Sequence, residues 1–160
     1  MFGFGDLWKF FLSFFLLLPI VTLIHEMGHY FFARLFGGNM EINIGSGKSL
    51  LRVGPIRLNR IYFWDGWCQY EALRKETKFA NILVYAGGSI ANLVSILVIN
   101  GLIYAGVFEA SIFTYQFAYF SFYFVFFSLF PIDHPNGYPS DGKAIINVFR
   151  YGKSDYHPQS

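Results

Sequence analysis

The chain has 160 residues, of which 54% are hydrophobic, 22% are aromatic and only 14% are charged. This composition excludes an ordinary soluble globular domain and predicts a protein that resides in a membrane. The net charge is only +2, and the single cysteine, Cys68, excludes an internal disulfide and a cysteine-based zinc site.

Three stretches of the sequence are apolar and long enough to cross a membrane. They cover about residues 8–36, 79–108 and 111–131. A helical span needs about 20 residues, so each stretch meets the requirement and the first two exceed it. We therefore expect an all-α membrane protein with three transmembrane helices. Between the first two helices we expect a small β-rich segment that is associated with the membrane.

The first predicted span contains the pentapeptide His25-Glu26-Met27-Gly28-His29. Two histidines four residues apart project from one face of a helix and can share a zinc ion. The glutamate between them can act as general base for metal-bound water. Ionisable groups that faced lipid would cost about 2.5–3.5 kcal/mol each, whereas groups that face a helix bundle and a metal would not. We therefore predict a metal site within the membrane. The motif lies near the end of the first span that leads into the basic middle segment, and the positive-inside rule makes that side the cytoplasmic face.

The segment of about residues 40–70 has the pattern of β structure. Apolar and polar residues alternate at 41–44 and 56–59, and Gly45, Gly47 and Gly54-Pro55 interrupt the run. We expect short strands or hairpins at the membrane surface or dipping into it. Their edge could pair with an unwound substrate by strand addition, or the segment could simply connect two spans. The charged residues 71–78 are helical in character and lead into the second span.

The second predicted span carries small and polar residues on one helical face, namely Gly88, Asn92 and Ser95. Small residues allow a neighbouring helix to approach closely, so Asn92 would point toward that neighbour. Its amide then has two candidate roles. It could form an interhelical hydrogen bond, or it could donate to the oxyanion formed during attack on a peptide bond.

After the third predicted span, prolines and glycines break the helix beside several potential metal ligands. A catalytic zinc usually takes three protein ligands and leaves one position for water, so the third ligand must come from outside the first span. The candidates are Asp133, His134, Asp141 and His157. Asp141 also has a purely structural alternative, because Ser140 or Asp141 could cap a helix over residues 143–150. Chemistry alone does not choose among the four.

Basic residues are concentrated between the first two spans. Eight of the 12 lysines and arginines lie between Arg34 and Lys78, and three more follow the third span. The positive-inside rule then places the N-terminus outside and both the middle segment and the tail of residues 132–160 in the cytoplasm. We expect a multi-pass protein of the cell membrane. Topology and lipid headgroups explain these charges, so nucleic acid is not expected as a partner.

Three separated motifs together resemble the site-2 protease family of intramembrane zinc metalloproteases. That family has H-E-x-x-H in its first core helix, a G-P-x-A-N-like element in the next and an N-x-x-P-x-P-x-L-D-G-like element with the third. The matching stretches are HEMGH at 25–29, GSIAN at 88–92, and SLFPI at 128–132 followed by PSDG at 139–142. The resemblance covers nearly the whole chain and corresponds to the three-helix core of the family.

The resemblance implies a role for each matched residue. His25, His29 and Asp141 would ligate one catalytic zinc ion, and Glu26 would activate the water. Asn92 would help to position the substrate or stabilise the oxyanion.

The chain also departs from the family pattern. Ser89 stands where the family has proline. Ser128 stands where it has asparagine, which predicts the loss of a supporting polar contact. An insertion over residues 133–138 separates the Asp-Gly element from the preceding Pro-Ile and keeps His134 as the main competitor of Asp141.

We therefore expect residues 1–160 to form a single intramembrane zinc metalloprotease core. It would hydrolyse peptide bonds of membrane-embedded or membrane-adjacent protein or peptide substrates, with Glu26 taking the proton of the attacking water. The alternative is a non-proteolytic membrane protein that binds metal or regulates a partner. An intact Glu26 argues against it, since a structural site needs no base. The sequence leaves the substrate and the oligomeric state open.

Overall fold

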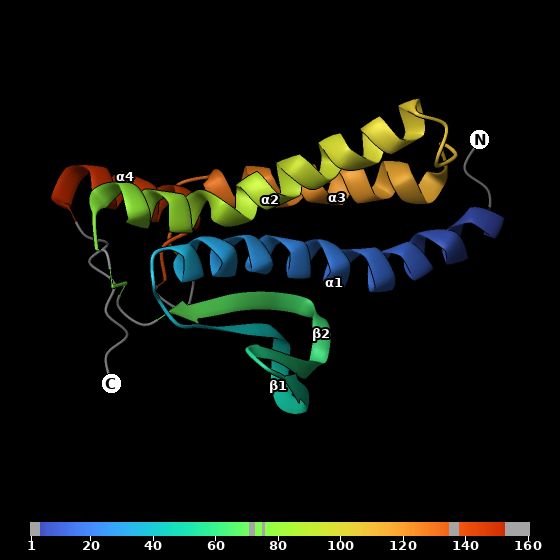
Figure 1. The fold of residues 1–160 in the computed structure, drawn as a ribbon. Helices are drawn as coiled ribbons and strands as arrows, with labels where there is room; N and C mark the ends of the chain where they lie inside the picture. Colours follow the sequence, from blue (N-terminus) through green and yellow to red (C-terminus); the bar gives the residue numbers. More distant parts are fainter. Residues whose placement is uncertain (1–3, 71–72, 75, 135–137, 153–160) are drawn as a thin grey trace.

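The computed structural model describes residues 4–70, 73–74, 76–134 and 138–152, which form three long helices, a two-stranded sheet and a short fourth helix (Figure 1). In chain order the elements are α1 (Phe4–Leu35), β1 (Met40–Val53), β2 (Ile56–Tyr70), α2 (Lys78–Tyr104), α3 (Ile112–Leu129) and α4 (Asp141–Tyr151). Among the described residues, three segments are long and apolar enough to cross a membrane: Phe14–Leu35, Lys78–Tyr104 and Ile112–Leu129. The predicted fold class is confirmed.

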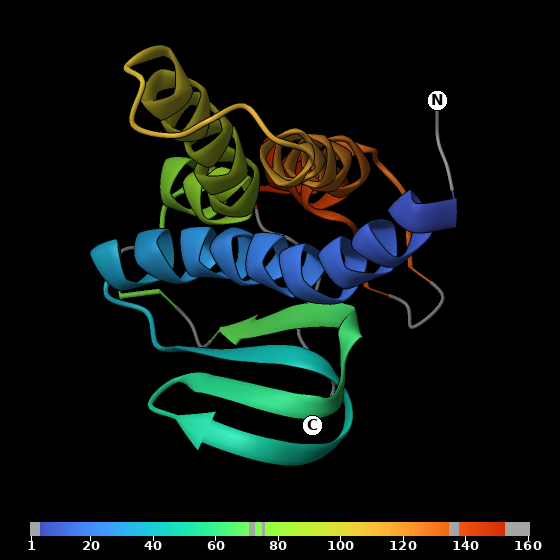
Figure 2. The same cartoon turned by 90° about the vertical axis from the view of Figure 1, so that its right-hand side faces the viewer.

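α1 is the central element of the molecule. The sheet covers one of its sides, and α2 and α3 cover the other (Figure 1, Figure 2). α4 lies at the end of the bundle where α1 ends and α2 begins (Figure 1). α1 therefore contacts every layer of the molecule, and a site on its inner face can draw residues from several elements.

α1 and α2 pack backbone to backbone at a pair of glycines. A Cβ atom on Gly28 would lie 2.2 Å from the backbone oxygen of Gly87, and one on Gly87 would lie 2.6 Å from the oxygen of Gly28. No side chain fits between the two backbones at this point. Close helix contact was predicted on the face of Gly88, Asn92 and Ser95. The backbones meet instead at the neighbouring Gly87, and Gly88 faces two histidine side chains of α1.

The sheet is a hairpin of two long, bent strands. A hairpin was among the expectations for this segment, but the strands are longer than the short strands that were also expected. Gly45 and Gly47 adopt φ angles of 80° and 89°, so they bend β1 without ending it. Residues 42–44 of β1 consequently pair with residues 66–68 of β2 on one edge and with residues 56–58 on the other. Gly54, with φ 57°, begins the two-residue turn between Val53 and Ile56. The curled sheet buries Ile42 and Ile44.

Capping groups set both ends of α2. Thr77 is extended and its side chain accepts a hydrogen bond from the Ala80 amide, so the helix begins only at Lys78. The described residues before it are not helical, in contrast to the expectation for 71–78. At the other end, Gly106 has φ 72° and the amides of Gly106 and Val107 donate to the carbonyls of Ile103 and Leu102. This arrangement ends the helix four residues before the predicted position 108.

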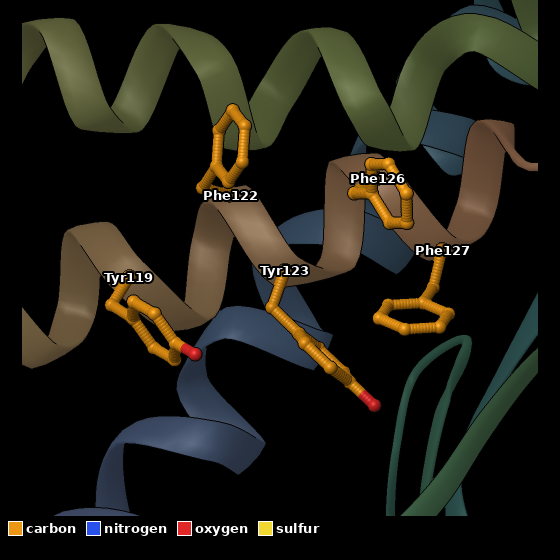
Figure 3. Close-up of a pocket in the computed structure, with 5 residues that line it drawn as sticks. All are labelled: Tyr119, Phe122, Tyr123, Phe126 and Phe127. Atoms are coloured by element: carbon orange, nitrogen blue, oxygen red, sulfur yellow. The ribbon is translucent and has the colours of Figure 1, made fainter.

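The outer face of α3 is aromatic. A shallow groove of about 180 Å³ is lined by Tyr119, Phe122, Tyr123, Phe126 and Phe127, all from this helix (Figure 3). All five side chains are exposed, whereas Phe117, Phe120 and Val125 on the inner face are buried. Exposed apolar faces of this kind are normal where the surrounding solvent is lipid, and they agree with a helix embedded in a bilayer.

Candidate metal centre

His25 and His29 lie one helical turn apart on the buried face of α1. Their exposed fractions are 5% and 6%, and their ring centroids are 4.8 Å apart with the planes nearly perpendicular. The spacing of four residues produces this arrangement, because residues i and i+4 of a helix project from the same face. Both Nε2 atoms point toward α2 at Gly88, where a Cβ atom would come within 2.5 and 2.6 Å of them. Glycine at this position leaves the space around the two nitrogens open.

Asp141, the first residue of α4, brings a carboxylate to the two imidazoles. Its Oδ2 atom lies 3.3 Å from Nε2 of His25 and 3.3 Å from Nε2 of His29. The three ligand atoms all lie within 4.8 Å of one another. Residues 116 positions apart in sequence therefore converge on one point.

Two neighbours of Asp141 explain how it reaches this position. Ser140 is the N-cap of α4, since its Oγ accepts from the Lys143 amide and donates to the Phe130 carbonyl oxygen. The capping role is thus filled by Ser140, and the Asp141 side chain is left to face the histidines. Gly142 packs so tightly on α3 that a Cβ atom there would lie 1.9 Å from the Leu129 oxygen. The Ser-Asp-Gly sequence fixes the start of α4 against the end of α3.

The donor set fits a zinc ion. Zinc binds imidazole nitrogen and carboxylate oxygen at about 2.0–2.2 Å, so two ligands at tetrahedral positions are separated by about 3.3–3.5 Å. The two nitrogen–oxygen distances of 3.3 Å agree with that separation. Two neutral imidazoles and one carboxylate are also a ligand set that catalytic zinc sites use, with a fourth position left for water.

The outward nitrogen of each imidazole has a partner on α2. Nδ1 of His29 lies 2.7 Å from the carbonyl oxygen of Val84, to which it donates, so Nε2 is the nitrogen that offers a lone pair to a metal when the ring is neutral. Nδ1 of His25 lies 3.2 Å from the amide nitrogen of Asn92, which is fully buried. Asn92 therefore makes the interhelical contact that was one of its two predicted roles. Val84 was not predicted, because a backbone carbonyl leaves no trace in a sequence pattern.

Glu26 follows His25 directly and is also buried, with an exposed fraction of 5%. A buried carboxyl group inside a membrane span is costly unless it has a function or a partner. Its position between the two histidines of α1 places it beside the cluster, as the sequence motif requires.

The remaining candidates for the third ligand lie elsewhere. Asp133 forms an ion pair with Lys143, and His134 is exposed on the connection between α3 and α4. His157 lies outside the described residues. Across the described part of the chain, the only group of three or more metal-binding side chains is His25, His29 and Asp141. The structure brings these three together and leaves Asp133 and His134 apart from them.

The electrostatic environment keeps Asp141 ionised. Burial by itself would raise the pKa of this carboxyl. The nearby His29 and the hydrogen bonds from His25 and His29 outweigh that effect, so the pKa lies well below its ordinary value. An ionised carboxylate is the form that binds a metal cation.

Ser128 contradicts the expectation that a polar contact is lost at its position. Its Oγ donates a hydrogen bond of 2.6 Å to Oδ2 of Asp141. Ser89, the other departure from the motif, lies within 3.2 Å of Ser128. The sequence marked both positions as unusual, but only the fold places them next to each other.

Comparison with known proteins identifies the family. The model described as Peptidase family M50 matches residues 13–152, a range that holds the whole cluster and both serines. The chain belongs to peptidase family M50. This family of zinc metalloproteases includes the site-2 proteases, so the resemblance seen in the three motifs is confirmed.

Two relatives differ in how far they match this M50 member. The "Uncharacterized membrane protein YwmF" of Bacillus subtilis is 50% identical over 153 residues, which cover 96% of both chains. An alignment of 109 positions with a "Putative zinc metalloprotease" of Borreliella burgdorferi shows 30% identity and covers 49% of this chain. This chain spans only 24% of that longer relative. No solved structure matches the chain.

Proposed function

We propose that this M50 member is an intramembrane zinc metalloprotease that hydrolyses peptide bonds of membrane-embedded or membrane-adjacent proteins. The observation that carries the proposal is the buried convergence of His25, His29 and Asp141 on one point. These side chains would hold one zinc ion, which when bound supplies a Lewis acid that activates water and polarises a carbonyl group.

Glu26 is the general base in this proposal. Its carboxylate takes the proton from the attacking water and later passes that proton to the leaving amine. A base is of use only where a bond is broken, so Glu26 favours a hydrolase over a protein that merely stores or senses metal. That non-proteolytic alternative remains the one against which the proposal is tested.

The placement of the cluster supports access from the cytoplasm. Val84, which holds His29, lies six residues after the start of α2, and Leu35 lies six residues after His29. Six residues of helix correspond to about 9 Å, so the cluster lies below one end of the bundle and far from the other. We propose that this end faces the cytoplasm of a cell-membrane protein, because the basic residues gather there. Water and an unwound substrate would enter from that side.

A comparison of the wild type with Glu26→Gln in detergent tests the proposal. Both proteins should bind close to one zinc ion per chain, because Glu26 is not assigned as a ligand. Cleavage of a model transmembrane substrate should fall by about 10²- to 10⁴-fold in the variant, the usual contribution of a general base. Equal cleavage by the two proteins would remove Glu26 from the mechanism. A wild type that holds zinc but cleaves none of a panel of transmembrane substrates would favour the non-proteolytic alternative.

The ligand set is tested by zinc content alone. Asp141→Ala should lose most of the bound zinc, whereas His134→Ala should retain it, because His134 is exposed and apart from the cluster. The reverse result would make His134 the third ligand.

A further inference from the structure

Two serines on different helices stand behind the Asp141 carboxylate. Ser128, near the end of α3, places its Oγ 2.6 Å from Asp141 Oδ2. Ser89 of α2 places its Oγ 3.2 Å from the Oγ of Ser128. Ser89 is buried, with an exposed fraction of 3%. The three side chains join α2, α3 and the first residue of α4 in one line of hydrogen bonds.

The chemistry of the groups fixes the direction of this line. An ionised carboxylate only accepts hydrogen bonds, so the single proton of Ser128 is directed to Asp141. Ser128 then has only lone pairs to offer to Ser89, and Ser89 must donate to it. Both hydroxyl dipoles therefore point toward the same carboxylate oxygen, and each hydrogen bond strengthens the next.

The oxygen that receives this line is the one that faces the histidines. Oδ2 of Asp141 accepts from Ser128 and is also the atom that lies 3.3 Å from both Nε2 atoms. Gly142 fixes the backbone beside it, but a backbone contact leaves the rotation of the Asp141 side chain free. Among the described residues, the Ser128 hydroxyl is the group besides the two histidines that contacts this oxygen and holds it in place.

The same two positions are those at which the chain departs from the family motifs. A proline at 89 could not donate a side-chain hydrogen bond, and without Ser89 the lone pairs of Ser128 would lack this donor. The two departures thus act as a pair: one serine supports the carboxylate and the other supports that serine.

We infer that Ser89 and Ser128 are positioning residues that hold the Asp141 carboxylate in the orientation that binds the metal. The inference rests on the proposed metal centre, but it concerns zinc affinity and not cleavage. Ser128 acts directly on Asp141, and Ser89 acts only through Ser128.

Zinc affinity of the purified full-length chain, measured by competition with a coloured chelator, tests the inference. Ser128→Ala should weaken zinc binding by about 10- to 100-fold, the usual effect of losing a hydrogen bond to a metal ligand. Ser89→Ala should have a smaller effect, and it should add nothing once Ser128 is already alanine. Ser128→Thr, which keeps the hydroxyl, should restore an affinity close to that of the wild type.

A matched control is available on the same helix. Ser121 is fully buried on α3, and its Oγ has no hydrogen-bond partner among the described residues. Ser121→Ala should leave zinc affinity unchanged. Thermal unfolding of the metal-free proteins separates a general loss of stability from an effect on the metal site. The four single variants and the double alanine variant should all unfold at similar temperatures.

The outcomes separate this inference from the proposed function. Two results would overturn the role of the serine pair in positioning Asp141 and leave the metalloprotease proposal standing. One is unchanged zinc affinity in Ser128→Ala, and the other is independent, additive effects of the two alanine substitutions. A wild type that binds no zinc would overturn both. A wild type that binds zinc but cleaves nothing would overturn the proposed protease function alone, because the affinity measurements do not depend on cleavage.

Discussion

Asn92 shows how a single amide can control which nitrogen of a histidine is free. An amide nitrogen only donates, so the contact between Asn92 Nδ2 and His25 Nδ1 places the proton of His25 on Nε2, facing Asp141. A zinc ligand needs the lone pair of Nε2, so the proton must then move to Nδ1 and find an acceptor. The Asn92 Oδ1 atom is buried and has no hydrogen-bond partner in the described structure. A rotation of about 180° of the Asn92 side-chain amide would bring Oδ1 to Nδ1 of His25, where it could accept the proton.

This reasoning makes a prediction for Asn92. Asn92→Ala should weaken zinc binding by about 10- to 100-fold, because Nδ1 of His25 loses its only assigned acceptor. Asn92→Asp should bind zinc as well as the wild type, since a carboxylate accepts the same hydrogen bond. Asn100→Ala is the control, because Asn100 is an exposed asparagine of the same helix. Loss of cleavage with unchanged zinc affinity in Asn92→Ala would assign the amide to the substrate or the oxyanion instead.

At the scale of elements, the crossing of α1 and α2 is what makes the cluster possible. Gly28 lies between the two histidines in sequence, and its contact with Gly87 brings the backbones together. The contacts of the histidines with Val84 and Asn92 flank that crossing along α2. Close approach of the backbones and correct orientation of the rings are therefore parts of the same packing arrangement.

We predict that Gly28→Ala separates the two helices. The added Cβ atom would meet the backbone oxygen of Gly87 at 2.2 Å, and a backbone atom cannot rotate away as a side chain can. Overpacking of this kind costs about 1–3 kcal/mol. Denaturant titration in detergent should show that loss, together with reduced zinc binding. Gly101→Ala is the matched control, because a Cβ atom there meets nothing within 4 Å. Equal stability of the two variants would mean that the crossing tolerates a wider spacing.

The sequence was sufficient to predict features that depend on residues close to one another in the chain. Helical spacing was enough to place His25 and His29 on one face and Asn92 toward a neighbouring helix. The strand lengths were missed because Gly45 and Gly47 bend β1, whereas a pattern of glycines is usually a sign of breaks. The choice between Asp141 and His134 depended on a cap at Ser140 and a tight contact at Gly142, which involve residues of α3 that only the fold brings close.

At the scale of the whole molecule, orientation in the membrane decides which side supplies water and substrate. The turn between α2 and α3 lies at the opposite end of the bundle from α4 (Figure 1). If the positive-inside rule holds, the exposed Glu109 in that turn faces outward, and Arg150 of α4 faces the cytoplasm.

Single cysteines test this topology in a Cys68→Ser background. A membrane-impermeant maleimide should label Glu109→Cys in intact cells, and it should label Arg150→Cys only after the membrane is permeabilised. The opposite labelling pattern would invert the proposed orientation and open the metal centre to the outside.

The origin of Asp141 in α4, after all three membrane spans, has a consequence for biosynthesis. A growing chain whose first three helices have already been inserted carries both imidazoles but not the carboxylate, and it cannot complete the coordination sphere. If the proposed protease function holds, hydrolytic capacity would arise only when the last helix docks. During insertion, the translocation machinery and neighbouring nascent proteins would meet a chain that is not yet able to cut them.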